Sequence, residues 1–219
     1  MARPTMTGRS AVVVGASAVA AVASAVAFSP GADAATLTLK HTGTITTHLK
    51  TRNQDLVFPT SEVTKVDANT FAVSSTITPG TARGSIDLGG VIRVVTMQVA
   101  ILPDGPATGQ TTFNPDGSGG NLTVTQKLKI QIQRVEPIGI KEINLVPNTC
   151  ISSKPASLNL TAPIGLDDEG ALNIFGPINL KGTLDIPAFA NCGLLLTPLL
   201  NAIASGPGND VTIALGAAA

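Results

Sequence analysis

The sequence predicts a mainly β protein, built as an antiparallel β-sandwich or an open barrel with one short helix near its C-terminus. Apolar and polar residues alternate with period two in one segment after another, as half-buried strands require. Charged residues make up only 13% of the chain, Trp and Tyr are absent, and 22 Gly and 15 Pro provide many turn positions. Only one stretch carries the signals of a helix.

Residues 1–34 predict an export signal. Arg3 and Arg9 give a positive start, residues 11–28 form a run of Ala, Val, Gly, Ser and Phe, and residues 32–34 place small side chains around a cleavage site. An uncleaved membrane anchor is the alternative for this run. We favour cleavage, because Ala and Gly hold a helix in lipid less well than Leu or Ile.

The predicted mature chain is a single β-rich domain of residues 35–219, secreted to the extracellular space or associated with the cell wall. Residues 114–121, Asn-Pro-Asp-Gly-Ser-Gly-Gly-Asn, form its clearest turn and mark where a boundary between two halves would lie. After signal cleavage, no segment is predicted to span a membrane.

In the first part of this domain, residues 36–50 predict a pair of strands with Gly43 as a bend or bulge. Residues 63–66 and 71–77 predict two further strands joined by a turn at 67–69.

The middle of the domain contains two different strand patterns. Residues 91–102 are apolar on both faces, which predicts a central strand covered on both sides, including Leu102. Residues 122–133 show the cleanest alternation of the chain. Ile138 and Ile140 continue after Pro137, and the phase then slips by one before Ile143 and Leu145, which predicts a bulge there.

The C-terminal part holds the predicted helix, with Thr197 as its cap, Pro198 in its first turn and Gly206 at its end. Its expected buried stripe is Leu199, Leu200 and Ile203. Three segments around it predict strands: residues 158–160, 178–186 and 211–215.

Cys150 and Cys192 are the two cysteines of the chain, and an even count in an exported protein predicts a disulfide. Closing a loop of about 40 residues would stabilise the fold by about 4 kcal/mol. A metal site would need more ligands, and a catalytic thiol would need a nearby base. The bond would hold the following helix against the sheet.

Several classes of function lack their usual residues. Without Arg3, Arg9 and Asp33 the chain keeps 12 basic and 13 acidic residues, a net charge of −1. It has no basic stripe and Phe is its only aromatic residue, so we expect no nucleic-acid partner. The missing Trp and Tyr likewise disfavour sugar binding. We assign no catalytic residue, cofactor or metal, and interpret the protein as a non-enzyme.

Two histidines and two acidic segments are the candidates for chemistry. His41 lies on an apolar face, where it is either a catalytic base or, as we favour, a buried histidine bonded to a backbone carbonyl. His48 lies on the polar face and is expected to be solvated. Residues 167–170 and 114–118 are rich in carboxylates and oxygens, but neither has the ligand spacing of a calcium loop. Both are interpreted as solvated turns.

The C-terminal region resembles a group of actinobacterial exported proteins of unknown function. The matching segments are Gly182–Gly193 (GTLDIPAFANCG), Leu196–Asn201 (LTPLLN) and Ser205–Asn209 (SGPGN). The resemblance implies an exported protein with a disulfide-linked β fold, and it supplies no catalytic residue.

Three functions remain as hypotheses. The first, which we favour, is a non-enzymatic protein of the cell envelope or extracellular space that has a structural or interaction role with an unidentified partner. The second is a carrier of an apolar small molecule or lipid, held in a β cup lined by residues 122–132 and 178–186 under a helical lid at 194–204. The third is a small hydrolase using His41, which no motif supports.

Overall fold

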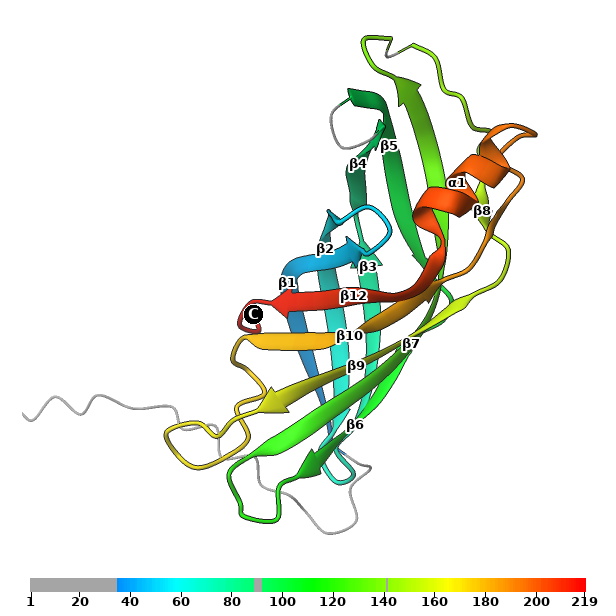
Figure 1. Cartoon of the computed structure of the whole chain (residues 1–219). Helices are drawn as coiled ribbons and strands as arrows, with labels where there is room; N and C mark the ends of the chain where they lie inside the picture. Colours follow the sequence, from blue (N-terminus) through cyan, green and yellow to red (C-terminus); the bar gives the residue numbers. More distant parts are fainter. Residues whose placement is uncertain (1–34, 89–91, 141) are drawn as a thin grey trace, which may run out of the picture. The chain divides into compact units, whose positions relative to one another are not determined.

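Eight antiparallel strands close into a barrel (Figure 1). The computed structural model describes residues 35–88, 92–140 and 142–219. Around the barrel the order is β1-β2-β3-β6-β7-β9-β10-β12, and β12 pairs again with β1. The strands are β1 (Thr36–Leu49), β2 (Gln54–Asp67), β3 (Ala72–Pro79), β6 (Ala107–Phe113), β7 (Gly120–Pro137), β9 (Ala156–Ile164), β10 (Ile178–Ile186) and β12 (Gly206–Leu215).

Four strands and one helix lie outside this ring. β4 (Thr81–Leu88) and β5 (Ile92–Pro103) form a hairpin that pairs with the second half of β7. β8 (Ile151–Ser152) and β11 (Phe189–Ala190) pair with each other, and α1 (Leu196–Ala204) is the short helix. The predicted mainly β fold with one C-terminal helix is confirmed. Of the two architectures expected, the structure has the barrel, and the pairing of β7 with β9 closes it.

The interior of the barrel is the core of the protein. Along β2 every second side chain from Leu56 to Val66 is buried, and β9 shows the same alternation over its whole length. Phe58, Leu160 and Ile213 are among the largest fully buried side chains. Each contributes about 2 kcal/mol or more by leaving water, so the period-two pattern read from the sequence is what drives closure.

Gly43 lies within one continuous strand, so the predicted strand pair is wrong. All of β1 pairs with β2 in unbroken register, while residues 43–48 also pair with β12. A Cβ atom at Gly43 would lie 2.0 Å from the carbonyl oxygen of Ala214. The glycine therefore allows close approach of β12 and does not bend the chain.

The bulge predicted between Ile140 and Ile143 is wrong, because β7 ends at Pro137 and these residues lie in the loop that follows. A bulge occurs earlier, within β7. The register between β5 and β7 shifts where Gln98 and Val99 face Arg134 and Ile132, which leaves Gln133 as the extra residue. β7 then ends at Pro137, because proline cannot donate a ladder hydrogen bond.

The two-sided cover predicted for residues 91–102 is wrong at Leu102, which is 39% exposed. Val91 and the side chains of Ile92 and Val94 lie outside the described residues. The predicted export signal at residues 1–34 also lies outside them.

Thr197 does not cap α1 as predicted. The helix starts two residues earlier, with Leu195 at the N-cap and no side-chain capping bond. The Thr197 hydroxyl donates to the Gly193 carbonyl over 2.8 Å and accepts from Cys192 N at 3.2 Å. It thereby fixes the turn after the cysteine.

The buried stripe of α1 was predicted in part. Leu200 and Ile203 are buried, whereas Leu199 is 46% exposed, contrary to expectation. The Thr51 hydroxyl, in the turn between β1 and β2, donates to the Ile203 carbonyl over 2.7 Å. These contacts seat α1 on one end of the barrel.

Candidate interaction surface

In the part of the chain that the structure describes, seven large aliphatic side chains are exposed on the loop that follows β7 and around the start of α1. Their exposed fractions range from 41% for Leu145 to 98% for Leu194. We call this set the apolar end. Its members are Ile138, Ile140, Ile143 and Leu145, from the loop between β7 and β8, and Leu194, Leu195 and Leu199, from the start of α1.

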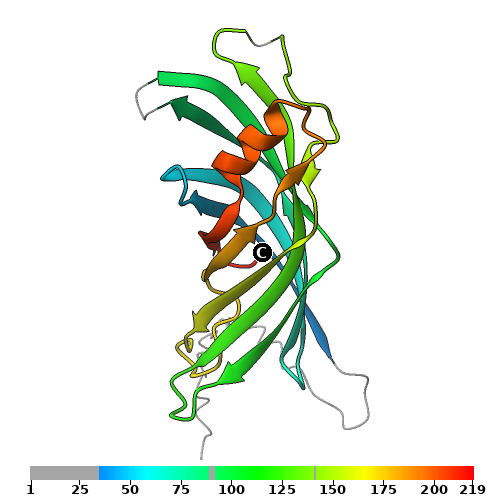
Figure 2. The ribbon, with the colours of Figure 1, turned by 45° about the vertical axis from the view of Figure 1, so that its right-hand side comes forward.

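A disulfide joins the two segments that make the apolar end. Cys150 and Cys192 are bonded, with Cα atoms 4.3 Å apart, which confirms the predicted pairing. The Thr149 hydroxyl also donates to the Asn191 carbonyl over 3.3 Å. In both ribbon views the loop that follows β7 runs down beside the loop that precedes α1 (Figures 1 and 2). The disulfide thus fixes the end of the first loop against the segment that leads into α1.

Asn144 shapes the first of these loops. Its side-chain oxygen accepts from Val135 N at 3.0 Å, and its amide group donates to the Gln133 carbonyl over 3.0 Å. Leu145 N donates in turn to the Val135 carbonyl over 2.9 Å. Val146 then turns into the core and is 4% exposed. The loop is bonded to the end of β7, so the outward position of its isoleucines is built into the fold.

Asn201 anchors the second loop by bonding α1 to β11. Its side-chain oxygen accepts from Phe189 N at 2.6 Å, and its amide group donates to the Phe189 carbonyl over 3.2 Å. Gly193 has φ +96°, a conformation that other residues rarely adopt. Leu194 and Leu195 follow that tight turn and project from the anchored helix start.

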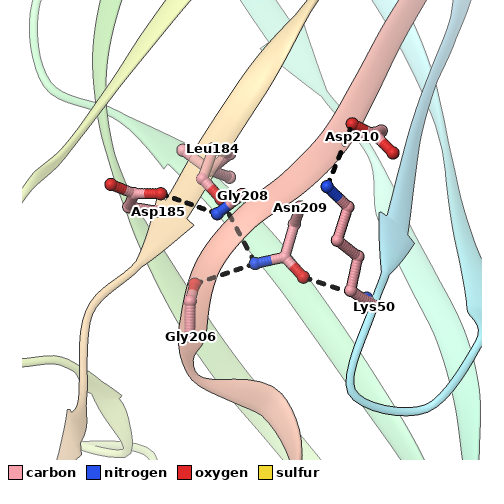
Figure 3. A network of polar contacts seen from close by, with 7 residues as sticks. All are labelled: Lys50, Leu184, Asp185, Gly206, Gly208, Asn209 and Asp210. Carbon is pink, nitrogen blue, oxygen red and sulfur yellow. Dashed lines mark hydrogen bonds and ion pairs between the residues drawn. The ribbon is translucent and has the colours of Figure 1, made fainter.

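A buried amide holds the strands beneath α1 (Figure 3). Asn209 is 3% exposed, donates to the carbonyls of Leu184 and Gly206, and accepts from Lys50 N. It satisfies backbone groups where the register between β10 and β12 shifts. Two contacts flank it: Gly208 N donates to Asp185 over 2.7 Å, and Lys50 Nζ lies 3.6 Å from Asp210. The SGPGN segment is therefore structural.

Neither histidine belongs to the apolar end. His41 is buried inside the barrel, and its Nδ1 lies 2.9 Å from the Gly216 carbonyl oxygen, the arrangement that the sequence analysis favoured. His48 lies on the outside, with Nδ1 2.7 Å from Asp55 Oδ1. The two histidines are seven positions apart on β1. Because this number is odd, their side chains point to opposite sides of the barrel wall.

The two acidic segments are turns organised by their own carboxylates. Asp167 Oδ1 accepts from Glu169 N and Ala171 N. Hydrogen bonds from the hydroxyl and the backbone N–H of Ser118 hold the pKa of Asp116 below its ordinary value. Within the part of the chain that the structure describes, no group of three or more His, Cys, Asp or Glu side chains could hold a metal ion.

A polar groove of about 700 Å³ opens beside the β4–β5 hairpin. Arg83, Arg134 and Glu136 are among its lining residues. The Arg134 Nε and Glu136 Oε1 atoms, two residues apart on β7, lie 2.6 Å from each other, so this pair is neutral and Arg83 adds one positive charge. One net charge on an open groove does not identify a ligand, and we do not place the function there.

Comparison with known proteins does not bear on this choice. No protein-family model matches the sequence, and neither the curated proteins nor the solved structures contain a match. Among residues 35–88, 92–140 and 142–219, no helix has both the length and the apolar character needed to cross a membrane.

Reasoning from sequence missed the apolar end. Its one local signal is the run Leu194-Leu195-Leu196. A nine-residue helix that buries only two large side chains has no place in the core for these three additional leucines. The isoleucines at 138, 140 and 143 read as part of a strand, because their spacing alone does not distinguish a buried position from an exposed one.

Proposed function

We propose that the protein is an exported, non-enzymatic protein that docks through its apolar end on a lipid surface of the cell envelope. The observation that carries this proposal is the exposure of seven Leu and Ile side chains on two loops that a disulfide joins. Large apolar side chains exposed together on neighbouring loops mark contact sites on soluble proteins.

Composition favours lipid over a folded protein partner. Protein interfaces are enriched in aromatic residues, Met and Arg, and Leu is under-represented among their strongest contacts. The apolar end contains only Leu and Ile. Residues 138–147 carry one Lys and one Glu, and residues 193–199 carry no charge. Leu and Ile are among the side chains that enter hydrocarbon most favourably.

The shape of the apolar end supports the same choice. Leu194 and Leu195 are 98% and 86% exposed, so they stand clear of the surface around them. A protruding turn of this kind can enter the headgroup–acyl boundary without a matching pocket. Burying one such leucine contributes about 1.5–3 kcal/mol. Two or three of them are enough for reversible docking.

A lipid carrier has less support. The chamber bordered by Leu122, Val124, Ile178 and Leu180 has a free volume of only about 50 Å³, well below the ~150 Å³ of a cavity that admits benzene. The helix that was expected to act as a lid instead packs Leu200 and Ile203 into the opposite end of the barrel.

Sedimentation with phosphatidylcholine vesicles tests the proposal. These vesicles carry no net charge, so electrostatic attraction between protein and lipid does not contribute to binding. We expect the protein to bind, and the double variant Leu194→Asn/Leu195→Asn to bind about 100-fold more weakly or worse, because each lost leucine contact is worth about a factor of ten or more. The matched control is Val57→Thr/Val63→Thr, which alters two exposed aliphatic side chains on the barrel wall (50% and 40% exposed).

The control variant should bind vesicles as the unmodified protein does. Absence of binding by the unmodified protein would contradict the proposal, as would equal loss of binding in both double variants.

A further inference from the structure

Five polar side chains lie inside the barrel at the end away from α1, and none is more than 8% exposed. One is Thr111 on β6, and the other four form a cluster: His41 on β1, Glu62 and Thr64 on β2, and Ser75 on β3. They line one side of the 50 Å³ chamber, whose other walls are mainly aliphatic. Burying these groups is costly unless each finds a partner.

The hydroxyl groups of the cluster both direct their protons toward Glu62. Thr64 Oγ1 donates to Glu62 Oε1 over 2.6 Å. Thr64 Oγ1 also lies 2.6 Å from Ser75 Oγ, and since the Thr64 proton is already used, Ser75 is the donor in this second bond. A relay of donors that ends on a carboxylate oxygen suits the ionised form of Glu62.

His41 adds a second acceptor to the chamber. A carbonyl oxygen only accepts, so Nδ1 of His41 carries the proton that bonds to Gly216, and in the neutral tautomer with that proton Nε2 is an acceptor. His41 and Glu62 are directly opposite each other in the β1–β2 register. Within the described chain, neither Nε2 nor the second Glu62 oxygen has a hydrogen-bond partner.

The charge of Glu62 is also uncompensated. In the region that the structure covers, no lysine, arginine or histidine forms an ion pair with it. A buried carboxylate without a cation is strongly disfavoured, whereas a cation placed beside it restores the balance. The chamber therefore presents one negative charge and two free acceptors.

We infer that this chamber is a binding site for a small primary ammonium compound. An ammonium group has three N–H donors, which suit the Glu62 oxygen and His41 Nε2, and its charge offsets that of the carboxylate. A short apolar chain would contact the aliphatic walls. A cavity needs about 10–15 Å³ of free volume to hold one water molecule. The chamber therefore has room for about three or four heavy atoms, which is the size of an amine with two or three carbons.

Entry to the chamber requires local opening at the end of the barrel. Leu172 and Ile174, in the segment between β9 and β10, line the chamber. The Ala218 N–H donates to the Phe175 carbonyl over 2.9 Å, so the C-terminal residues close the same end. Asn173 N also donates to the Gly165 carbonyl and Ala219 N to the Lys40 carbonyl, so opening must break several backbone hydrogen bonds. This end of the barrel is far from the apolar end, so the inference is independent of lipid docking.

Thermal unfolding with added propylammonium chloride tests this inference on the disulfide-bonded protein. We expect a saturable rise in melting temperature that 1-propanol, of the same shape and without charge, does not give. Glu62→Gln preserves the acceptor for Thr64 and removes the charge, so it should weaken the response at least 10-fold. Glu142→Gln, exposed in the loop between β7 and β8 at the other end of the barrel, should leave the response unchanged.

A second variant covers the case in which Glu62→Gln does not fold. Val73→Leu adds a methylene group to the chamber wall, keeps Glu62, and should also weaken the response to propylammonium. The inference is overturned if propylammonium gives no saturable effect on the unmodified protein. It is equally overturned if 1-propanol acts as well, or if the folded Glu62→Gln protein responds fully.

Discussion

Replacing Gly43 with valine is expected to break the barrel between β1 and β12. The new Cβ would lie 2.0 Å from the Ala214 carbonyl oxygen and 2.9 Å from its carbon, both backbone atoms that cannot rotate away. Relief requires separation of pairs such as Gly43 with Leu215 and Thr44 with Ala214, which join the first strand to the last. We expect the free energy of unfolding to fall by about 4 kcal/mol or more, the range of severe backbone and packing conflicts.

Urea unfolding followed by circular dichroism measures this loss, since the chain has no Trp or Tyr to report by fluorescence. Gly165→Ala is the matched control, because a Cβ there would have no atom within 4 Å and the change should be nearly neutral. A loss below about 1 kcal/mol for Gly43→Val would show that β1 and β12 are not in close contact.

Removing the disulfide with Cys150→Ser/Cys192→Ser is expected to lower the free energy of unfolding by about 4 kcal/mol. The cysteines are 42 residues apart in sequence, and the bond restricts the unfolded chain over that whole loop. Both residues are completely buried, so the cost of placing hydroxyl groups there adds to the loss. The bond is also the covalent link between the two segments of the apolar end.

Chemical reduction provides the control for this variant. Dithiothreitol should destabilise the unmodified protein by a similar amount and leave the serine variant unaffected. If the unmodified protein already contains two free thiols under oxidising conditions, or if reduction changes its stability by less than about 1 kcal/mol, the disulfide does not have the role assigned to it.

Much of the fold could be predicted because its signals are local. Alternation along residues 122–133 and 178–186 required only that one face be buried, and both became barrel strands. The disulfide followed from the number of cysteines and the predicted compartment. His41 was placed on the interior face because it lies two residues from Leu39 on the same strand.

The errors and omissions concern features that depend on distant residues. Closure of the barrel depends on β12 reaching β1, and Gly43 shows its purpose only when Ala214 lies against it. Thr197 matches a cap by type, yet its hydroxyl is used by the turn at Gly193. The polar cluster in the chamber needs two strands brought into register before His41 and Glu62 meet.

The most direct test of lipid docking uses the absence of tryptophan from the chain. Leu195→Trp places a single fluorophore on the apolar end, and Phe175→Trp places one at a 55% exposed position at the other end of the barrel. With phosphatidylcholine vesicles, we predict that the Leu195→Trp protein shifts its emission to the blue and is quenched by brominated acyl chains, while the Phe175→Trp protein does neither. Unchanged emission from Leu195→Trp, or equal quenching of both, would contradict docking through the apolar end.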